Sequence, residues 1–225
     1  MTSAYSYTQD KLFIGGEWVA PLDGELVPSI NPAAGKPWAL AAFGGARDID
    51  RAVDAAGAAM RGPWGRMPAG ERAALMRKLG ALLEANAERI AELETRDNGR
   101  PFRETRLNIT AEAQWYYYFA GLADKLDGRM MQINQSLIAY TTRVPIGVVG
   151  AIVPWNAPTL VTTMKLAPAL AAGCAIVVKV AEHTPVTTYE LAKLVEQSGF
   201  PKGVVNIVPG WGHIAGVHLA AHPGV

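Results

Sequence analysis

The last third of the chain has the most regular pattern of apolar runs and helical segments. Three apolar runs of strand length alternate with segments whose apolar residues have helical spacing. In chain order these are residues 147–153, 158–172, 175–180, 185–198, 204–208 and 213–221. Each run is apolar on both faces, which is typical of a parallel sheet covered by helices on both sides. Right-handed connections then place the functional crevice beyond the carboxyl ends of the strands.

Helical periodicity dominates the chain before residue 128. Asp48 is predicted to cap a first helix whose apolar residues fall on one face. Residues 71–98 carry apolar side chains at spacings of three and four, and Asn86 leaves open whether this is one helix or two. A further helix is expected over residues 107–126. In the last third, Thr184 is predicted to cap the helix that begins at Pro185.

Two shorter segments have the pattern of β-hairpins. Residues 13–19 place two apolar runs about a Gly-Gly turn, and residues 129–144 place β-forming residues about a polar turn. The Pro- and Gly-rich passage 21–37 is expected to be irregular surface chain. The chain is therefore predicted to be α/β with three parts. They are a helical part, 1–128, a hairpin, 129–146, and a βαβαβα part, 147–225.

Composition and charge exclude several classes of protein. The 225 residues are 50% hydrophobic, which is ample for one large domain or two small ones. A net charge of +1 gives no electrostatic reason to expect a nucleic-acid or anionic-membrane partner. The apolar runs are too short for a membrane span, and the first residues lack a signal-peptide pattern. The single cysteine fits a reducing compartment, so a cytoplasmic location is expected.

Candidate binding residues follow each apolar run of the last third. Asn156, on a turn flanked by prolines, either donates its amide to a developing oxyanion or only stabilises the turn. Lys179 and Glu182 either hold ribose hydroxyls or form a surface ion pair. Gly212 and Gly216, in a G-x-G-x-x-x-G segment, either allow a ligand to approach the backbone or only form a turn.

Two other residue types with possible chemistry are expected to have none. His218 and His222 have the i, i+4 spacing of a metal pair, but no neighbouring carboxylate or cysteine joins them in the sequence. They are expected to be surface histidines, and no metal site is predicted. Cys174 enters an apolar run at the end away from Asn156, so a buried structural role is expected.

Eight motifs occur in order along the chain. They are LFIGGEWV, INPAAGKP, VPIGVVGAI, PWN, KLAPALAAG, KxxExTP, GFPxGVVNxVPG and GxxAG. Together they resemble the N-terminal part, including the coenzyme-binding region, of the NAD(P)-dependent aldehyde dehydrogenase superfamily, from about Lys11 to Val225. The resemblance implies an incomplete aldehyde dehydrogenase-like fold, with a Rossmann-like parallel sheet and flanking helices. It also implies that the hairpin 129–146 is an arm through which full-length members form homo-oligomers.

The resemblance implies roles for nine residues. Asn156 would donate its amide to the oxyanion formed when a thiolate attacks an aldehyde. Lys179 and Glu182 would hold the adenosine ribose, and the carboxylate of Glu182 would repel a 2′-phosphate, so NAD is favoured over NADP. The other implied coenzyme contacts, four beside the nicotinamide and two at the adenine end, are Ile152, Val153, Pro154 and Trp155, then Gly212 and Gly216.

The general-base Glu and nucleophilic Cys of the family pattern are not found in these residues. The resemblance implies a longer parent that oxidises a small-molecule aldehyde to a carboxylic acid with NAD, through a Cys thiohemiacetal and thioester. This chain would supply the coenzyme site and the oxyanion Asn, and alone it is predicted to be inactive. The alternative is a catalytically inactive truncated binding or interaction module.

Overall fold

A central five-stranded sheet organises the computed structural model, which describes residues 5–225. The strand order is β3-β2-β10-β9-β8, in which β8, β9 and β10 run parallel and the hairpin β2–β3 pairs antiparallel beside β10. In sheet order the strands are β3 (Glu17–Val19), β2 (Leu12–Ile14), β10 (Val205–Pro209), β9 (Ala175–Val180) and β8 (Val148–Ile152). The α/β prediction and the three parallel strands are confirmed.

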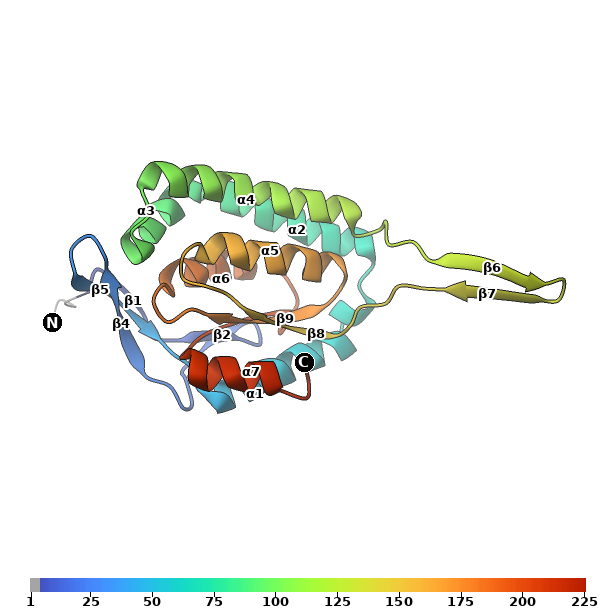
Figure 1. Ribbon diagram of the computed structural model, residues 1–225, viewed down its shortest axis with the longest axis horizontal. Helices are drawn as coiled ribbons and strands as arrows, with labels where there is room; N and C mark the ends of the chain where they lie inside the picture. The colour runs from blue at the N-terminus through green and yellow to red at the C-terminus, as the bar shows by residue number, and fades with distance from the viewer. Residues whose placement is uncertain (1–4) are drawn as a thin grey trace.

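Helices cover both faces of this sheet (Figure 1). The helices α5 (Pro158–Ala171) and α6 (Val186–Ser198) pack on one face, and α1 (Ala46–Arg61) and α7 (Val217–Ala221) lie on the other. Every residue of β9 is buried, as the apolar run predicts for a strand with helices on both sides. An outer layer packs against α5 and α6. It consists of α2 (Ala69–Ala85), α3 (Ala87–Asn98) and α4 (Phe102–Leu122).

The helix starts differ from the sequence predictions. Residues 69–98 form two helices separated at Asn86, whose side chain donates to the Leu82 carbonyl at 2.8 Å. The first helix begins at Ala46, so Asp48 lies within its first turn and accepts from the Gly45 N–H at 3.0 Å. Thr184 does not cap α6, because its hydroxyl donates to the Trp155 carbonyl at 3.1 Å. Neither Asp48 nor Thr184 is therefore the cap residue that local sequence indicated.

The passage 21–37 is not irregular, and that prediction is wrong. It contains β4 (Leu26–Asn31), which pairs antiparallel with β5 (Lys36–Ala42), and β1 (Tyr7–Gln9) runs parallel to β5. The order of this second sheet is β1-β5-β4, so β4 is an edge strand. An edge strand tolerates Pro28 because its outer side needs no ladder donor, which explains why proline content misled the prediction.

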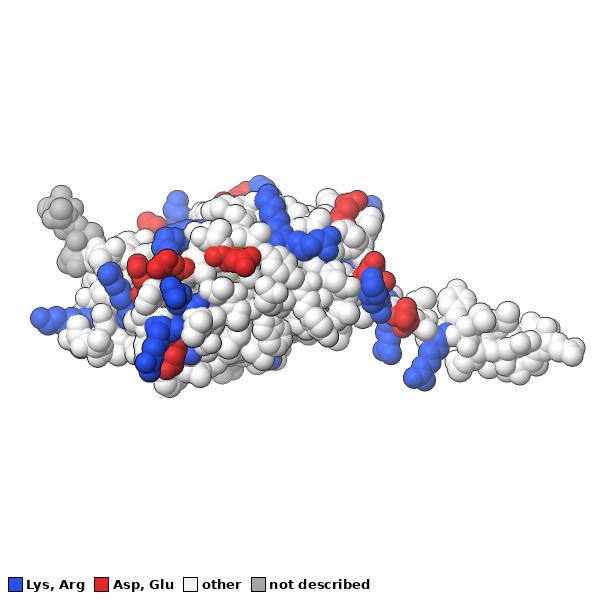
Figure 2. Space-filling model, turned by 90° about the horizontal axis from the view of Figure 1, so that it is seen from above, with Lys and Arg blue, Asp and Glu red and all other residues white. Residues whose placement is uncertain are grey.

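The predicted hairpin at residues 129–144 is confirmed and projects from the body (Figure 1). It consists of β6 (Arg129–Asn134) and β7 (Leu137–Thr141), which pair antiparallel. Its large apolar side chains are exposed, including Met130 at 76% and Tyr140 at 75%. Residues 130–142 contain no charged side chain, and Figure 2 shows the arm uncoloured beyond its base.

The remaining elements are short turns of helix, a 3₁₀ turn at Trp64–Arg66 and a π-helical turn, η2, at Gly212–Gly216. Within residues 5–225, we find no helix with both the length and the apolar character needed to traverse a bilayer.

Asp97, buried at the end of α3, joins three elements. One carboxylate oxygen accepts from the Ser29 hydroxyl of β4 at 2.5 Å, and the other accepts from the Val186 N–H at the start of α6 at 3.0 Å. Burial outweighs these hydrogen bonds and raises the pKa of Asp97 from 3.8 to about 7.

Stability should therefore fall as the pH rises through the titration of Asp97. Because the folded-state pKa is above the unfolded one, this contribution is complete below 3.8 and is lost as the pH rises through about 7. Asp97→Asn removes this titration but leaves the buried Glu94 and Glu112 in place. Urea unfolding of both proteins across this pH range should show a flatter profile for the variant. Identical profiles would contradict the assignment.

Candidate functional site

The carboxyl ends of β8, β9 and β10 meet at one edge of the central sheet. Lys179 of β9 lies in register with Ile152 of β8 on one side and with Val208 of β10 on the other. The Val153 N–H donates to the Lys179 carbonyl at 3.1 Å, which extends this alignment past the end of β8. The three segments that contain the candidate binding residues therefore emerge side by side, as the parallel arrangement predicts.

Lys179 and Glu182 form an ion pair at the end of β9. The Lys179 Nζ donates to Glu182 Oε2 at 2.9 Å, and only 4% of the Lys179 side chain is exposed against 27% for Glu182. Partial burial by itself raises the pKa of Glu182, but the hydrogen bond and charge of Lys179 outweigh it and lower the pKa below 4.5. The buried ammonium shows that this is not a pair between two solvated surface side chains.

Two glycines lie against this ion pair. A Cβ atom added at Gly212 would lie 3.8 Å from Glu182 Oε1 and 3.9 Å from Lys179 Nζ. One added at Gly216 would lie 3.9 Å from Lys179 Cε. These glycines begin and end η2, so the backbone of that turn borders the charged pair without any side chain between them. The fold thus brings together four of the candidate residues, namely Lys179, Glu182, Gly212 and Gly216.

The loop after β8 is hydrogen-bonded to the end of α3 and to the turn that precedes α6. The Trp155 carbonyl accepts from Thr184, and the Asn156 carbonyl accepts from the Asn98 side chain at 3.4 Å. Asn156 is exposed, as are Ile152, Pro154 and Trp155, whereas the Val153 side chain is buried in the core. Val153 can therefore meet a ligand only through its backbone.

A groove of about 650 Å³ runs past this edge. Trp155 and Glu182 line it together with Trp211 and Asn98. Ile152 instead lines a separate hollow along β8, the outer strand of the sheet, so the structure does not place all nine candidate residues in one cavity.

Sequence reasoning assigned no role to Trp211 and Asn98. Trp211 packs edge-on against Phe43 at 5.5 Å between ring centroids and donates from Nε1 to Glu25 at 2.8 Å. Its position between two glycines after a strand was a usable signal. Asn98 gave no such signal, because it ends an amphipathic helix and reaches this edge only through tertiary packing.

Cys174 lies at the opposite end of the sheet from Asn156. It precedes the first residue of β9, is 3% exposed, and its carbonyl accepts from Trp64 Nε1 at 3.1 Å. The expectation of a buried structural cysteine is confirmed.

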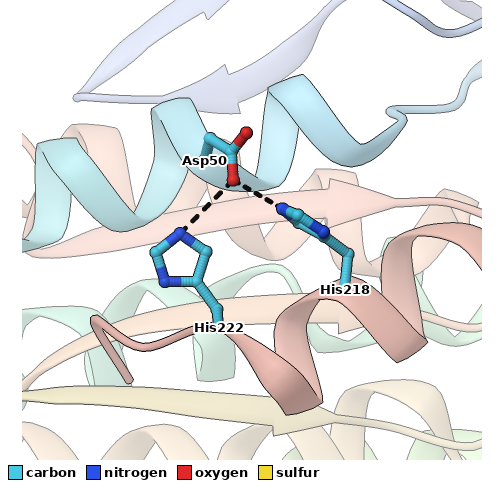
Figure 3. Close-up of side chains that lie close together, drawn as sticks. All are labelled: Asp50, His218 and His222. Atoms are coloured by element: carbon cyan, nitrogen blue, oxygen red, sulfur yellow. Dashed lines mark hydrogen bonds and ion pairs between the residues drawn. The ribbon is translucent and has the colours of Figure 1, made fainter.

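No carboxylate neighbours His218 and His222 in the sequence, but the fold brings one beside them. Asp50, from α1, contacts both imidazoles (Figure 3). Its distance of 168 residues from His218 along the chain explains why local spacing missed it.

Comparisons with known proteins show which family and fold this chain resembles. The model of the aldehyde dehydrogenase family matches residues 18–225. An aldehyde dehydrogenase of Enchytraeus buchholzi is 45% identical over 96% of this chain and 44% of its own length. The mitochondrial aldehyde dehydrogenase of Homo sapiens is 42% identical over 96% of this chain and 42% of its own length. The chain therefore spans less than half the length of these curated relatives.

Solved structures show the same fold. The NAD⁺ complex of an aldehyde dehydrogenase from Bacillus cereus has a TM-score of 0.94 and 41% identity, over 96% of this chain and 45% of that one. HpcC from Thermus thermophilus has a TM-score of 0.93 and 38% identity, over 96% of this chain and 42% of that one. The family match over residues 18–225, with the fold that these structures share, shows that this chain belongs to the aldehyde dehydrogenase family.

Proposed function

We propose that this chain forms the coenzyme-binding part of an enzyme that oxidises an aldehyde to a carboxylic acid with NAD. The main support for this proposal is the Lys179–Glu182 ion pair. It lies directly against Gly212 and Gly216 at the carboxyl ends of parallel strands. Ligands of open α/β sheets bind at such ends. The Bacillus cereus relative, which has this fold, was solved as an NAD⁺ complex.

The charged pair suits the hydroxyls of an adenosine ribose. The ionised carboxylate of Glu182 accepts hydrogen bonds, and the ammonium of Lys179 donates them, so both hydroxyl protons and lone pairs find partners. The exposed side of Glu182 faces the groove that also contains Trp155. A 2′-phosphate placed beside this carboxylate would be repelled, which favours NAD over NADP.

The loop after β8 suits the nicotinamide end. Ile152, Pro154 and Trp155 present exposed apolar surface, and Val153 offers its backbone. Bound NAD supplies the hydride acceptor of the reaction. The residues of this chain would hold its ring in place beside Asn156.

Asn156 is proposed as the donor to the oxyanion. Attack of a thiolate on an aldehyde carbon places negative charge on the carbonyl oxygen, and a fixed amide N–H stabilises that charge. The loop is fixed at the Trp155 and Asn156 carbonyls, which leaves the exposed Asn156 side chain free to point at substrate. Cys174 cannot supply the thiolate from the other end of the sheet, so we propose that thiolate and general base come from residues outside these 225.

The projecting hairpin is proposed to bind a second copy of the protein. An exposed arm with apolar side chains and no charge between residues 130 and 142 resembles an interface more than a solvated surface (Figure 2). The full-length protein is therefore proposed to be a homo-oligomer.

A second candidate function is a catalytically inactive binding module. The observation that favours it is that the only thiol of these 225 residues, Cys174, is buried. Both candidate functions use the same coenzyme site, so an assay of aldehyde-dependent turnover distinguishes them.

The chain alone should produce no NADH from NAD⁺ and an aldehyde, because it lacks an accessible thiol. Fusion of residues 1–225 to the C-terminal part of the Bacillus cereus relative should restore aldehyde-dependent NADH absorbance. Turnover by the chain alone would overturn the predicted inactivity. A folded fusion that binds NADH but gives no turnover would favour the binding module.

In that fusion, Asn156→Ala should lower kcat by about 10²–10³-fold, the usual loss for one oxyanion donor. The KM for NAD⁺ should stay unchanged, because the amide acts on the substrate oxygen. Steady-state kinetics measure both, and an unaltered kcat would remove Asn156 from the mechanism.

Coenzyme binding can be tested on the chain itself. Energy transfer from tryptophan to NADH should report binding, and Glu182→Gln should weaken it about tenfold through loss of a charged hydrogen-bond acceptor. The same variant should discriminate less against NADPH. Glu88→Gln, at an exposed position on α3, is the matched control and should bind like the parent. Equal affinities of the parent and Glu182→Gln would contradict the ribose assignment.

A further inference from the structure

A cluster of two imidazoles and one carboxylate lies on the face of the sheet that α1 and α7 cover. His218 is on α7, His222 follows its last residue, and Asp50 lies in α1 (Figure 3). The Asp50 Oδ1 lies 2.5 Å from His218 Nε2 and 3.3 Å from His222 Nε2. One ligand-type atom of each residue lies within 4.8 Å of those of the other two.

The fold explains why these side chains converge. The i, i+4 spacing places both histidines on one side of the C-terminal helical turn, and α1 packs against α7. Both imidazoles point toward the carboxylate (Figure 3). His222 is 14% exposed, His218 38% and Asp50 48%, so the cluster is partly enclosed and open to an ion from solvent.

We propose that Asp50, His218 and His222 bind a divalent transition-metal cation of the Zn²⁺ class. Two imidazole nitrogens and a carboxylate oxygen are a donor set typical of Zn²⁺, with water as a fourth ligand. Mg²⁺ and Ca²⁺ prefer oxygen ligands and would be held poorly. With bonds of about 2.0–2.1 Å, tetrahedral ligands lie about 3.3 Å apart, which is close to the His222–Asp50 separation. His218 Nε2, which lies 2.5 Å from the same oxygen, would move away by about 0.8 Å when the ion binds.

Without metal, hydrogen bonds hold the cluster. The Gly224 N–H donates to His222 Nδ1 at 3.0 Å, which leaves the proton of a neutral imidazole on Nε2, facing Asp50. A metal bound at Nε2 replaces this proton, and the proton of the neutral imidazole is then on Nδ1. Gly224 then loses its acceptor, but it is an exposed residue, so its N–H can donate to solvent instead.

Metal binding would join the C-terminal segment to α1. The helix α7 begins directly after Gly216, the last residue of the turn that borders Lys179. A cation held by α1, α7 and His222 would therefore restrain the segment that also contains Gly212 and Gly216 of the proposed coenzyme site. The site does not depend on the proposed function, because no ligand of one belongs to the other.

The test is a Zn²⁺ titration of the 225-residue chain, purified without a polyhistidine tag and stripped with chelator. Calorimetry should show one Zn²⁺ per chain, and Tm should rise with added Zn²⁺ because the ion binds the folded state. His218→Gln and Asp50→Asn should each weaken binding by at least about tenfold. The double variant His183→Gln with His213→Gln changes the other two histidines and should bind like the parent.

Circular dichroism establishes that each variant is folded, and Co²⁺ absorption gives an independent readout of the nitrogen and oxygen ligands. If one of the two variants, His218→Gln or Asp50→Asn, does not fold, Zn²⁺ binding by the other tests the proposal. Absence of binding, or equal binding by a folded His218→Gln or Asp50→Asn variant, would overturn the proposal. Loss of binding in the control, or one Zn²⁺ shared by two chains in sedimentation, would also overturn it.

Discussion

The burial of the Lys179 ammonium at the end of β9 constrains the edge of the sheet where the candidate binding residues lie. An ammonium taken out of water needs a charged or hydrogen-bonding partner, and Glu182 provides one only if the chain turns back within three residues. That turn fixes the end of β9, the middle one of the three parallel strands. It also leaves space beside the pair that only the glycine backbone of η2 borders.

Other buried polar side chains hold the outer elements to this frame. Asn206 of β10 is fully buried, and its amide accepts from the Gly15 N–H at 2.8 Å and donates to the Gly203 carbonyl at 2.8 Å. It thereby attaches the turn between β2 and β3 to the parallel strands. Asp97 similarly joins α3, β4 and α6 beside the groove. Each satisfied polar group specifies one arrangement of its neighbours, since any other leaves a buried donor unpaired.

The segment after β10, residues 212–222, contacts two different parts of the molecule. Its glycines border Lys179 at the carboxyl ends of the parallel strands, while His218 and His222 contact Asp50 on the face covered by α1. Five residues of η2 followed by five of α7 therefore connect the proposed coenzyme site at Lys179 with the proposed metal site. Both depend on how this short segment packs, because neither set of contacts lies within one element.

Local patterns in the sequence were enough to predict the parallel strands, the helices between them and the residues at the strand ends. Apolar runs with β-branched residues and helical periodicity are local patterns, and parallel topology brings Asn156, Lys179 and Gly212 to one edge. Other features follow only from long-range packing. It made a strand of the segment around Pro28, brought Asn98 to the groove and placed Asp50 beside two histidines. Those outcomes depend on contacts between residues far apart in the chain, which no local pattern encodes.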